Sequence, residues 1–518
     1  MNDRVVPLEP SARVAALAGV VAGGAALGVT ELLAGLVRGA PSVVVAIGSL
    51  AIALQPAGAK QIVVDLFGTA DKLVLNLAVA LGALVLASLF GLIGRRSRGW
   101  SALGFGGLAV LGLAASLRDP LVEPVFAIAS AVIGALVAIY GLDWLFEQAR
   151  MPEPVTEMPN WGRRRFIGSS LALAGVAVAG GGLGRYLLGR RSDEPALGTP
   201  SIPAAVDPVA ALPDGADLAV SGLSPVVTSN QTFYRIDTSL LTPRLDLSQW
   251  RLNVSGMVDR PFTLTYAELL AMPMHEQYVT IACVSNEVGG DLVGNALWRG
   301  ARLRDLLDRA GVQAGASQVV GRSYDGWTAG FPTTWLDEPG RGALVVVAMN
   351  GSPLPAEHGF PARLIVPGLY GYVSATKWLT NIELTTLDAF DAYWVPLGWA
   401  KKAPILTQSR IDVPRAGNGP LAAGLVPVAG VAWAPDRGVS RVELKVDDQP
   451  WTEAELSAPI SDATWVQWLY RWQAAPGAHL LQVRATDGTG ALQDERQTRP
   501  APDGARGYHA ITLEVSAG

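Results

Sequence analysis

Cysteine is almost absent from this sequence, since Cys283 is the only one among 518 residues. A single cysteine excludes an intramolecular disulfide, so its sulfur either fills space in a core or acts as a thiolate, as a nucleophile or a metal ligand. Cys283 follows the apolar run 278–282 and precedes the glycine-rich turn 284–290. We therefore expect it at a strand end, where loops often carry binding groups, although buried free cysteines also serve as small apolar residues.

Histidine is scarce as well, and none of the four occurs before His275. The first half of the chain therefore cannot supply the paired histidines that hold a b-type haem. The sequence also lacks a patch of lysine and arginine with interleaved aromatic residues, and its formal net charge is −5. The missing basic patch and the negative net charge together exclude nucleic acid as a partner.

Long apolar runs fill the first half of the chain, whereas from Ser192 onward charge, proline and tryptophan are spread as in an ordinary globular protein. Such runs are long enough to cross a bilayer. The predicted spans are residues 14–37, 73–93, 101–117, 121–140 and 166–188. The shorter segment 42–54 is predicted to be re-entrant or interfacial.

Two groups of basic residues flank these spans, at Arg95, Arg96 and Arg98 and again at residues 163–165. By the positive-inside rule both groups are cytoplasmic. Provided that the segment 42–54 does not cross, the N-terminus then lies on the cytoplasmic side as well, and the C-terminal half emerges on the outer side of the cell membrane. The run 163–168 has the form of a twin-arginine export signal, a signal for proteins that are folded before export. A plain positive-inside flank is the alternative.

Glu31 is the one carboxylate inside the first span, and such groups are functional candidates by default. Helix packing or a position near the interface is the alternative. We expect no second charged partner in the spans and, apart from Asn76, few polar groups, so a transporter is the weaker interpretation.

The second half begins with a linker rich in proline, alanine and aspartate, residues 195–217. Strand-like and helix-like pieces then alternate without a regular period, which favours a mixed α+β domain over a doubly wound one. The predicted strands are 250–256, 262–264, one ending at Cys283, and 343–349, and the predicted helices are 266–270 and 303–310.

From about Pro404 the pattern changes to short strands separated by Asp, Gly and Pro turns. The strands are predicted at residues 425–433, 439–446, 465–472 and 479–486. This spacing predicts an Ig-like β-sandwich. Its tryptophans alternate along the strands and are predicted to pack in the core or at an interface rather than to form a ligand platform.

Several motifs together resemble the molybdopterin core of the sulfite oxidase family. They are residues 283–286 with Gly289 and Gly290, the runs 294–300, 350–354 and 358–363, then 366–368, Gly371 and residues 377–378. The runs 430–433, 442–443 and 484–487, with Trp451 and Gly490, resemble the Ig-like dimerisation domain of that family. The resemblance covers the chain from about Asn230 to its end and implies a homodimer.

The resemblance implies one molybdenum held by one molybdopterin, with Cys283 as the protein ligand beside the dithiolene and oxo or hydroxo groups. A soft thiolate suits such a metal. The cofactor contacts that it implies are Asn230, Phe233, Tyr234, Cys283, Ser285, Asn286, His358, Arg363 and Lys377. A structural histidine at 358, an arginine capping a carboxylate at 363, and simple packing at Phe233 are the alternatives. Gly294 and Gly368 are predicted to be turn glycines.

Glu287 stands where sulfite oxidases carry an arginine that helps to bind the oxyanion. A carboxylate there disfavours a dianionic substrate by charge repulsion. Arg299, Arg302 or Arg322 could compensate. Tyr324 and Asp325 are candidate catalytic residues in contact with substrate, with an ordinary turn as the alternative.

The sequence thus predicts a multi-domain protein: a transmembrane helical region (1–190), a linker (191–225), a molybdopterin-binding α+β core (226–400) and an Ig-like sandwich (401–518). We expect an oxidoreductase in contact with membrane lipid that transfers an oxygen atom to or from a small, sulfur-containing or related substrate. We expect no haem in the chain, so that the electron partner is a separate cytochrome or a quinone-linked component. The alternative is a non-catalytic receptor or adhesin that keeps a relic of the cofactor fold.

Overall fold

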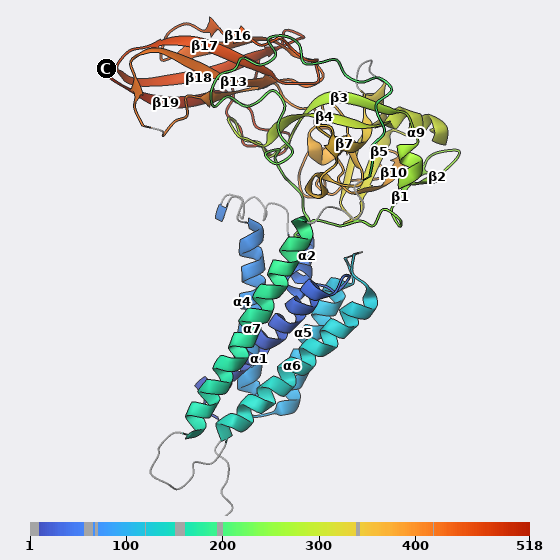
Figure 1. The fold of residues 1–518 in the computed structure, drawn as a ribbon, viewed down its shortest axis with the longest axis vertical. Helices are drawn as coiled ribbons and strands as arrows, with labels where there is room; N and C mark the ends of the chain where they lie inside the picture. The colour runs from blue at the N-terminus through green and yellow to red at the C-terminus, as the bar shows by residue number, and fades with distance from the viewer. Residues whose placement is uncertain are drawn as a thin grey trace, which may run out of the picture. The chain divides into compact units, whose positions relative to one another are not determined.

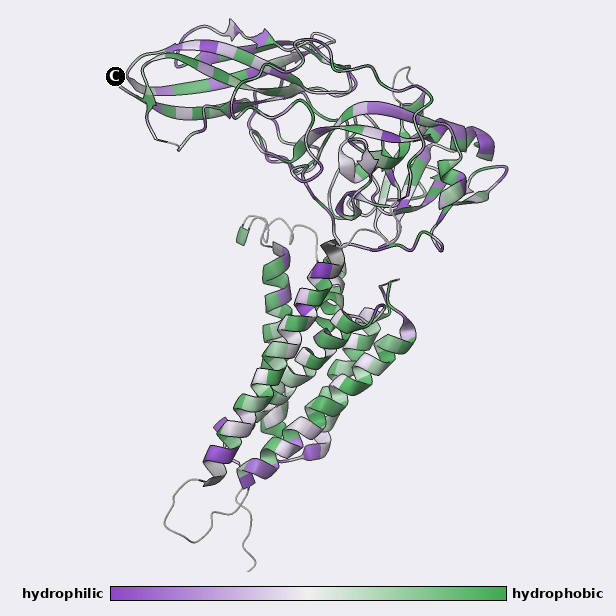
Figure 2. Ribbon diagram, in the orientation of Figure 1, coloured by the Kyte–Doolittle hydropathy of each residue, from purple (hydrophilic) through white to green (hydrophobic). Residues whose placement is uncertain are grey.

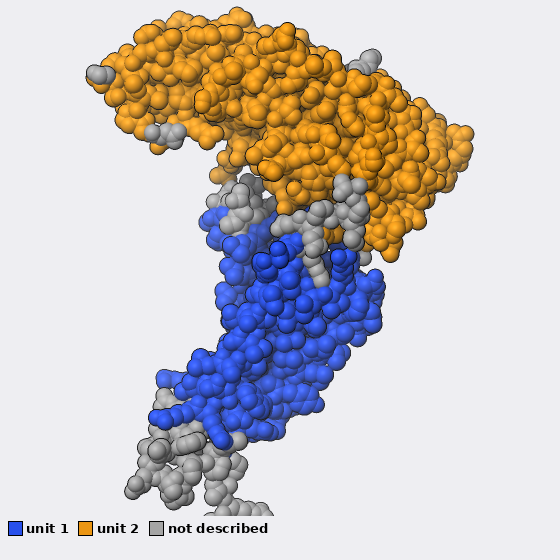
Figure 3. Space-filling model, in the orientation of Figure 1, with its two compact units in different colours: residues 1–194, 239–242 blue, residues 195–238, 243–518 orange. Residues whose placement is uncertain are grey.

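The computed structural model describes residues 10–55, 66–67, 71–119, 121–150, 161–193, 200–337, 342–417 and 419–517. Arg4 and the first linker residues, 195–199, lie outside this part of the chain. The chain divides into two compact units, coloured separately in Figure 3: residues 1–194 with 239–242, and residues 195–238 with 243–518. The four predicted domain boundaries stay a prediction.

The first unit is a helical bundle (Figure 1). Its helices are α1 (Ala12–Leu36), α2 (Val43–Leu54), α4 (Asp71–Gly94), α5 (Arg98–Ser116), α6 (Pro124–Arg150) and α7 (Trp161–Asp193). All but α2 are long and apolar enough to cross a membrane, and Figure 2 shows apolar residues along most of their length. α6 and α7 extend beyond the apolar runs because helix ends can carry charged residues such as Asp143.

Helix α2 lies between two antiparallel helices, α1 and α4. Gly19 of α1 packs against Ala87 of α4, and Gly91 of α4 packs against Ala15 of α1, so α1 and α4 are antiparallel. The end of α1 and the start of α4 therefore lie on the same side of the bundle. The 12 residues of α2 span about 18 Å, too short to cross a bilayer. That the segment 42–54 is re-entrant or interfacial stays a prediction.

Glu31 has a charged partner, so the expectation that it has none was wrong. Its Oε2 lies 3.1 Å from Nε of Arg185 in α7, which falls inside the predicted last span. The carboxylate also accepts hydrogen bonds from Ser42 Oγ (2.8 Å) and from the backbone N–H of Val44 (3.3 Å). Because Ser42 caps α2, Glu31 places its negative charge at the N-terminus of that helix, where charge and helix dipole attract.

The second unit contains two mixed regions of strand and helix. Its first sheet has the order β3-β4-β7-β8, with β9 also paired to β7. These strands are β3 (Met274–Ala282), β4 (Val293–Arg302), β7 (Leu344–Met349), β8 (Ser352–Pro353) and β9 (Arg363–Ile365). The second sheet has the order β2-β1-β10-β5-β6. Its strands are β1 (Arg251–Gly256), β2 (Phe262–Thr265), β5 (Gln318–Ser323), β6 (Thr328–Pro332) and β10 (Leu379–Thr385).

Short helices connect these strands. They are α8 (Tyr266–Leu270), α9 (Leu303–Ala310), α10 (Gly371–Ser374) and the 3-10 turns η2 (Thr333–Leu336) and η3 (Ala356–His358). Helix α9 buries Leu303, Leu306 and Leu307 along one face, as their spacing predicts. Helix α8 begins with a capping box between Thr265 and Glu268. A mixed α+β arrangement therefore replaces a regular βαβ repeat.

The C-terminal part forms two further sheets, β11-β13-β17-β16 and β12-β19-β18-β14-β15. Their strands are β11 (Gln408–Val413), β12 (Leu421–Ala422), β13 (Gly424–Trp433), β14 (Val439–Val446), β15 (Thr452–Glu453), β16 (Glu455–Leu456), β17 (Val466–Ala474), β18 (Gly477–Asp487) and β19 (His509–Ser516). One apolar cluster joins both sheets, from Val428 and Trp468 on one to Val442 and Leu481 on the other. We call this part the sandwich; its Ig-like class stays a prediction.

Candidate cofactor-binding site

Cys283 sits at the base of a closed turn between β3 and β4, which we call the cysteine turn (residues 283–292). The backbone N–H of Cys283 donates to Leu292 O (2.9 Å), and its carbonyl accepts from the N–H of Asn286 (3.0 Å). Asn286 Oδ1 in turn accepts from the N–H of Leu292 (2.8 Å). The Cys283 side chain is buried, with 7% of the residue exposed. The turn therefore fixes the sulfur at a strand end, as the sequence predicts.

The other predicted residues of this turn differ in surroundings. The side chain of Asn286 is engaged in closing the turn, whereas Ser285 and Glu287 are exposed. The structure thus gives Asn286 a structural partner, and the predicted cofactor contacts of Ser285 and Asn286 stay predictions.

Four predicted residues gather beside β3 and β4 around the ring of Phe233. That ring stacks on Tyr234 (5.3 Å between centroids) and meets His358 edge-on (5.7 Å). The guanidinium of Arg363 lies 5.0 Å from the ring of Trp298, which Phe233 also contacts edge-on. Side chains from a loop, from η3 and from β9 therefore converge on one apolar cluster.

Gly294 makes room for this cluster, so its prediction as a turn glycine was wrong. It lies in β4, paired with Ile281, and a Cβ there would come within 2.8 Å of the Phe233 ring. A strand glycine is needed where another group approaches the backbone closely. Gly368 does lie in a turn, with φ +82°.

Two buried polar atoms in this cluster have no hydrogen-bond partner. His358 Nε2 lies 2.7 Å from Asn230 O, and Arg363 donates to His358 O (3.1 Å), but His358 Nδ1 and Arg363 Nε are unpaired. Both residues are at most 3% exposed. Such atoms normally find partners, because an unsatisfied buried group costs about 1–3 kcal/mol. Because Asn230 O can only accept, the neutral His358 ring carries its proton on Nε2 and leaves Nδ1 as an acceptor, whereas Arg363 Nε is a donor. An acceptor and a cationic donor in one place fit a group with both N–H donors and anionic oxygens, such as a pterin with its phosphate.

Burial also perturbs the charges of these residues. It lowers the pKa of His358 to about 4 and that of Arg363 to about 10. The imidazole is therefore neutral at pH 7, while the guanidinium keeps its charge. Burial is also the main reason why the pKa of Tyr234 is raised, and the charge of Cys283 adds to it. The Tyr234 hydroxyl near Cys283 is thus a neutral donor.

Lys377 and Asn230 bound the same region. Lys377 Nζ donates to Asp237 Oδ2 (3.1 Å) and to Glu357 O (2.9 Å), and burial lowers its pKa to about 8. Asn230 holds the turn after β7 through its amide, which donates to Met349 O (3.2 Å) and accepts from Asn350 (2.8 Å). Sequence reasoning did not identify Asp237 as the partner of Lys377.

Tyr324 and Asp325 lie in a turn between β5 and β6, on the Lys377 side of the region. The N–H of Tyr324 donates to Trp378 O (2.8 Å). Asp325 Oδ1 accepts from the N–H of Trp327 (3.2 Å), and burial followed by the nearby charge of Asp237 raises its pKa. Tyr324 and Asp325 therefore lie in an ordinary turn, which was the alternative interpretation. Substrate contact by the two residues stays a prediction.

The three arginines suggested to replace the missing cation are placed elsewhere. Arg299 pairs with Glu276 (2.5 Å) in β3, about 20 Å along the strands from Cys283. Arg302 pairs with Asp207 (3.0 Å) at the same distant end, and Arg322 pairs with Glu383 (2.6 Å) in the other sheet. Each is bound to a carboxylate, so none compensates for Glu287 next to Cys283.

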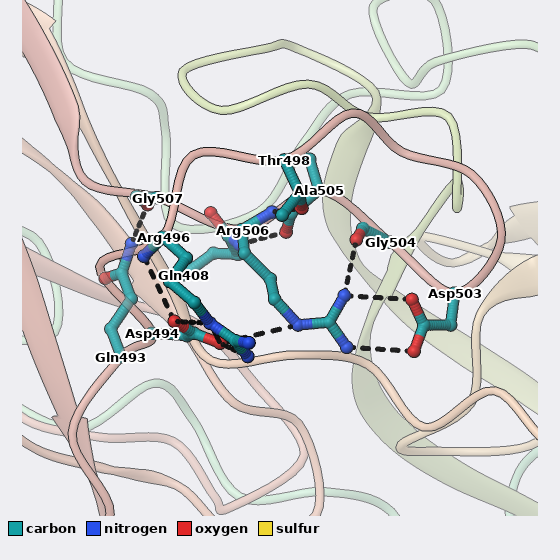
Figure 4. A network of polar contacts seen from close by, with 10 residues as sticks. All are labelled: Gln408, Gln493, Asp494, Arg496, Thr498, Asp503, Gly504, Ala505, Arg506 and Gly507. Atoms are coloured by element: carbon teal, nitrogen blue, oxygen red, sulfur yellow. Dashed lines mark hydrogen bonds and ion pairs between the residues drawn. The ribbon is translucent and has the colours of Figure 1, made fainter.

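Sequence reasoning missed Tyr370, which lies just before α10. Burial raises its pKa, and the charges of Cys283 and Arg506 also act on it. A Cβ on Gly504 would come within 2.5 Å of the Tyr370 hydroxyl, so the loop between β18 and β19 packs against it. In that loop Arg506 makes two bonds to Asp503 (2.9 and 2.8 Å) and lies near Asp494, as Figure 4 shows. The charge of Arg506 is therefore balanced.

Comparisons with known proteins show the family of this chain. Residues 239–394 match the family described as the oxidoreductase molybdopterin binding domain. An uncharacterized oxidoreductase, YuiH of Bacillus subtilis, is 38% identical over 154 residues, which are 30% of this chain and 74% of that protein. Mitochondrial sulfite oxidase of Mus musculus is 28% identical over 320 residues, which are 52% of this chain and 57% of that protein.

A solved structure shows the same fold. The sulfane dehydrogenase SoxCD from Paracoccus pantotrophus has a TM-score of 0.50 and 21% identity, over 57% of this chain and 85% of that chain. At this identity the likeness concerns the fold alone. The chain spans little more than half the length of the sulfite oxidase that it matches, 57%.

Proposed function

Because this chain belongs to the sulfite oxidase family of molybdopterin-binding oxidoreductases, we propose that it is a membrane-anchored enzyme that moves an oxygen atom onto or off a small substrate. The observation that carries the proposal is a buried cysteine at a strand end together with the buried, unpaired atoms His358 Nδ1 and Arg363 Nε. Tyr234 links them, because the charges of both Cys283 and Arg363 act on it. When bound, molybdenum in its pterin supplies the two-electron redox change and the oxygen transfer.

The residues of the chain hold and orient this cofactor. Cys283 supplies the thiolate, which the metal keeps deprotonated. His358 and Arg363 bind the polar edge and phosphate of the pterin, with Lys377 and Asn230 at its border, and Arg363 suits a phosphate because its planar donors match the oxygens. Phe233 and Tyr234 shield the site from water. One unpaired buried donor and one unpaired buried acceptor favour this proposal over a receptor with a relic fold, which would have no reason to keep them.

The groups around Cys283 favour an uncharged substrate. Tyr234 and Tyr370 stay protonated there, Glu287 is exposed on the turn, and Arg506 is balanced by Asp503. Neutral hydroxyl donors suit the oxygen of a sulfoxide or an N-oxide, whereas a dianion such as sulfite needs unbalanced cations. Tyr324 and Asp325 are proposed to contact the substrate from the Lys377 side.

The helical unit is proposed to anchor the enzyme in the cell membrane, with the second unit outside. Arg95, Arg96 and Arg98 follow α4, and the basic run 163–165 opens α7, which supports a cytoplasmic location for both positions. Electrons are proposed to pass to or from a separate cytochrome or quinone-linked partner. A homodimer through the sandwich also stays a proposal.

Metal analysis of the protein purified from membranes tests the cofactor assignment. We expect one molybdenum per chain, released together with an oxidised, fluorescent pterin, and loss of the metal in Cys283→Ser. Retention of molybdenum at the same occupancy in that variant would refute the role of Cys283.

Anaerobic turnover with a dye donor or acceptor tests the substrate class. We expect activity with sulfoxides or N-oxides and little with sulfite. Activity with sulfite alone would contradict the argument from Glu287 and Arg506.

A further inference from the structure

The far end of the cysteine turn is held by the sandwich. Arg410, in β11, is buried, with 8% of its surface exposed. Its NH1 donates to the carbonyl of Gly290 in the cysteine turn, at 2.6 Å. A short bond from a cation to a carbonyl is among the stronger hydrogen bonds in proteins. The turn that carries Cys283 is therefore attached to a strand more than a hundred residues later in the chain.

The guanidinium of Arg410 is itself fixed by two other partners. Its Nε donates to Asp412 Oδ1 (2.6 Å), and its NH2 donates to Ser224 Oγ (2.9 Å). Asp412 Oδ2 in turn accepts from the N–H of Ser224 (3.0 Å). Because each partner restrains the next, the fork of donors has one orientation. The Asp412 carboxylate also balances the positive charge of Arg410. Arg410 therefore acts on the cysteine turn by fixing the position of Gly290, and not by adding a net charge.

His509, the first residue of β19, makes a second contact at the same end. Its Nδ1 accepts from the N–H of Ile411 (3.0 Å). A Cβ on Gly289 would come within 2.3 Å of its ring, and Gly289 has φ +80°, a conformation that favours glycine. Two strands of the sandwich, one from each of its sheets, therefore press on residues 289 and 290.

The inside of the cysteine turn transmits this restraint to the sulfur. The bonds from Cys283 to Leu292, from Asn286 to Cys283 and from Leu292 to Asn286 close it at its base. A turn closed in this way moves as one body, so a shift at Gly290 shifts Cys283 as well.

We propose that Arg410 is a positioning residue that sets the place of the Cys283 sulfur, and that the sandwich is thereby part of the cofactor site. This proposal rests on the proposed function.

Alkylation of Cys283 in protein freed of cofactor tests the restraint without any need for activity. Cys283 is the single cysteine of the sequence, so iodoacetamide reports on this turn alone. We expect Arg410→Gln to react about 10- to 100-fold faster than the wild type, because losing a charge-assisted hydrogen bond makes local opening that much easier. Arg410→Lys should recover part of the protection, because its ammonium still donates to Gly290.

Arg484→Gln is the matched control. Arg484 is also a sandwich arginine, paired with Glu443 (2.9 Å) on β14 and stacked on Trp451. All rates are measured well below the melting temperature of each variant, which separates local release of the turn from global unfolding. Equal alkylation rates, within twofold, for Arg410→Gln and Arg484→Gln would overturn the proposal. If Arg410→Gln does not fold, Ser224→Ala removes one partner of Arg410 and should show a smaller rise.

The loaded enzyme gives a second readout. With molybdenum retained, Arg410→Gln should lower kcat about 10- to 100-fold with KM nearly unchanged, and should alter the Mo(V) electron paramagnetic resonance spectrum. An unchanged spectrum and kcat would overturn the positioning role. Wild-type protein without molybdenum would instead refute the proposed function, while the alkylation rates would still report on the turn.

Discussion

Both units of the protein bury charged side chains, and Glu31 in the first differs from Arg363 in the second in how fully its surroundings satisfy it. Glu31, in the helical unit, is 4% exposed and accepts from Ser42, Val44 and Arg185. Arg363, in the second unit, is 3% exposed and keeps Nε unpaired beside the unpaired Nδ1 of His358. A satisfied buried charge holds elements together, whereas an unsatisfied one leaves free donors for a ligand. Glu31 is therefore a structural charge, whereas Arg363 is the one that we propose to bind the cofactor.

Glu31→Ala should show the largest loss of stability. Removing one member of a buried charge pair costs about 3–5 kcal/mol, and the lower end applies because the Arg185 side chain is 35% exposed. The helices should therefore melt at a lower temperature in far-UV circular dichroism of the detergent-solubilised chain, while the molybdenum content per folded chain stays unchanged. Lost molybdenum with unchanged melting would reverse the roles that we give to the two charges.

Acid should weaken the cofactor-free protein through His358. Its pKa is about 4 in the folded chain and about 6.5 when unfolded, so the unfolded state takes up the proton first. The contribution of His358 to the free energy of unfolding is then constant above pH 6.5, falls by up to about 3 kcal/mol between pH 6.5 and 4, and levels off below. Comparing unfolding of the wild type and His358→Gln across this range isolates the effect. Parallel pH curves for the two proteins would show that His358 is not buried in its neutral form.

Arg363→Gln should weaken retention of the pterin. A hydrogen bond to a charged group contributes about 1.5–3 kcal/mol, which corresponds to about 10- to 100-fold in cofactor release. The release rate is followed by pterin fluorescence during dilution of the loaded enzyme. Arg299→Gln is the matched control, because Arg299 pairs with Glu276 at the distant end of β3. Equal release from both variants would contradict a cofactor contact at Arg363.

Gly294→Ala should have the smallest effect, about 1 kcal/mol. The added methyl would meet the ring of Phe233 at 2.8 Å, and overpacking of this size lies at the low end of its usual cost. Gly182→Ala is the control in the helical unit, since a Cβ there has no atom of the described residues within 4 Å. The unfolding temperature should fall for Gly294→Ala, whereas Gly182→Ala should leave it unchanged or raise it, because alanine favours a helix over glycine. An equal fall in both would refute the close approach of Phe233.

The sequence predicts the architecture where local patterns decide it. Apolar runs predict the spans, and the spacing of Leu303, Leu306 and Leu307 predicts α9. A strand followed by glycines places Cys283 correctly at a strand end. These features depend on neighbours in the chain, so composition and periodicity reveal them.

Long-range partners escape the same reasoning. Arg185 is distant from Glu31 in sequence, and nothing near Glu31 indicates it. The sequence around Arg410 gives no sign of a special role, and only the packing of the sandwich brings its side chain to Gly290. Tyr370 lies inside a recognised motif, but its approach to Cys283 depends on how α10 meets β3. Such pairs are set by tertiary packing, which local patterns do not encode.

X-ray absorption at the molybdenum edge tests the central claim most directly, because it counts the sulfur ligands of the metal. The account predicts that the wild type shows the dithiolene sulfurs plus one more, and that the extra sulfur disappears in whatever molybdenum Cys283→Ser or Cys283→Ala retains. The same number of sulfur ligands in the wild type and in these variants would contradict it.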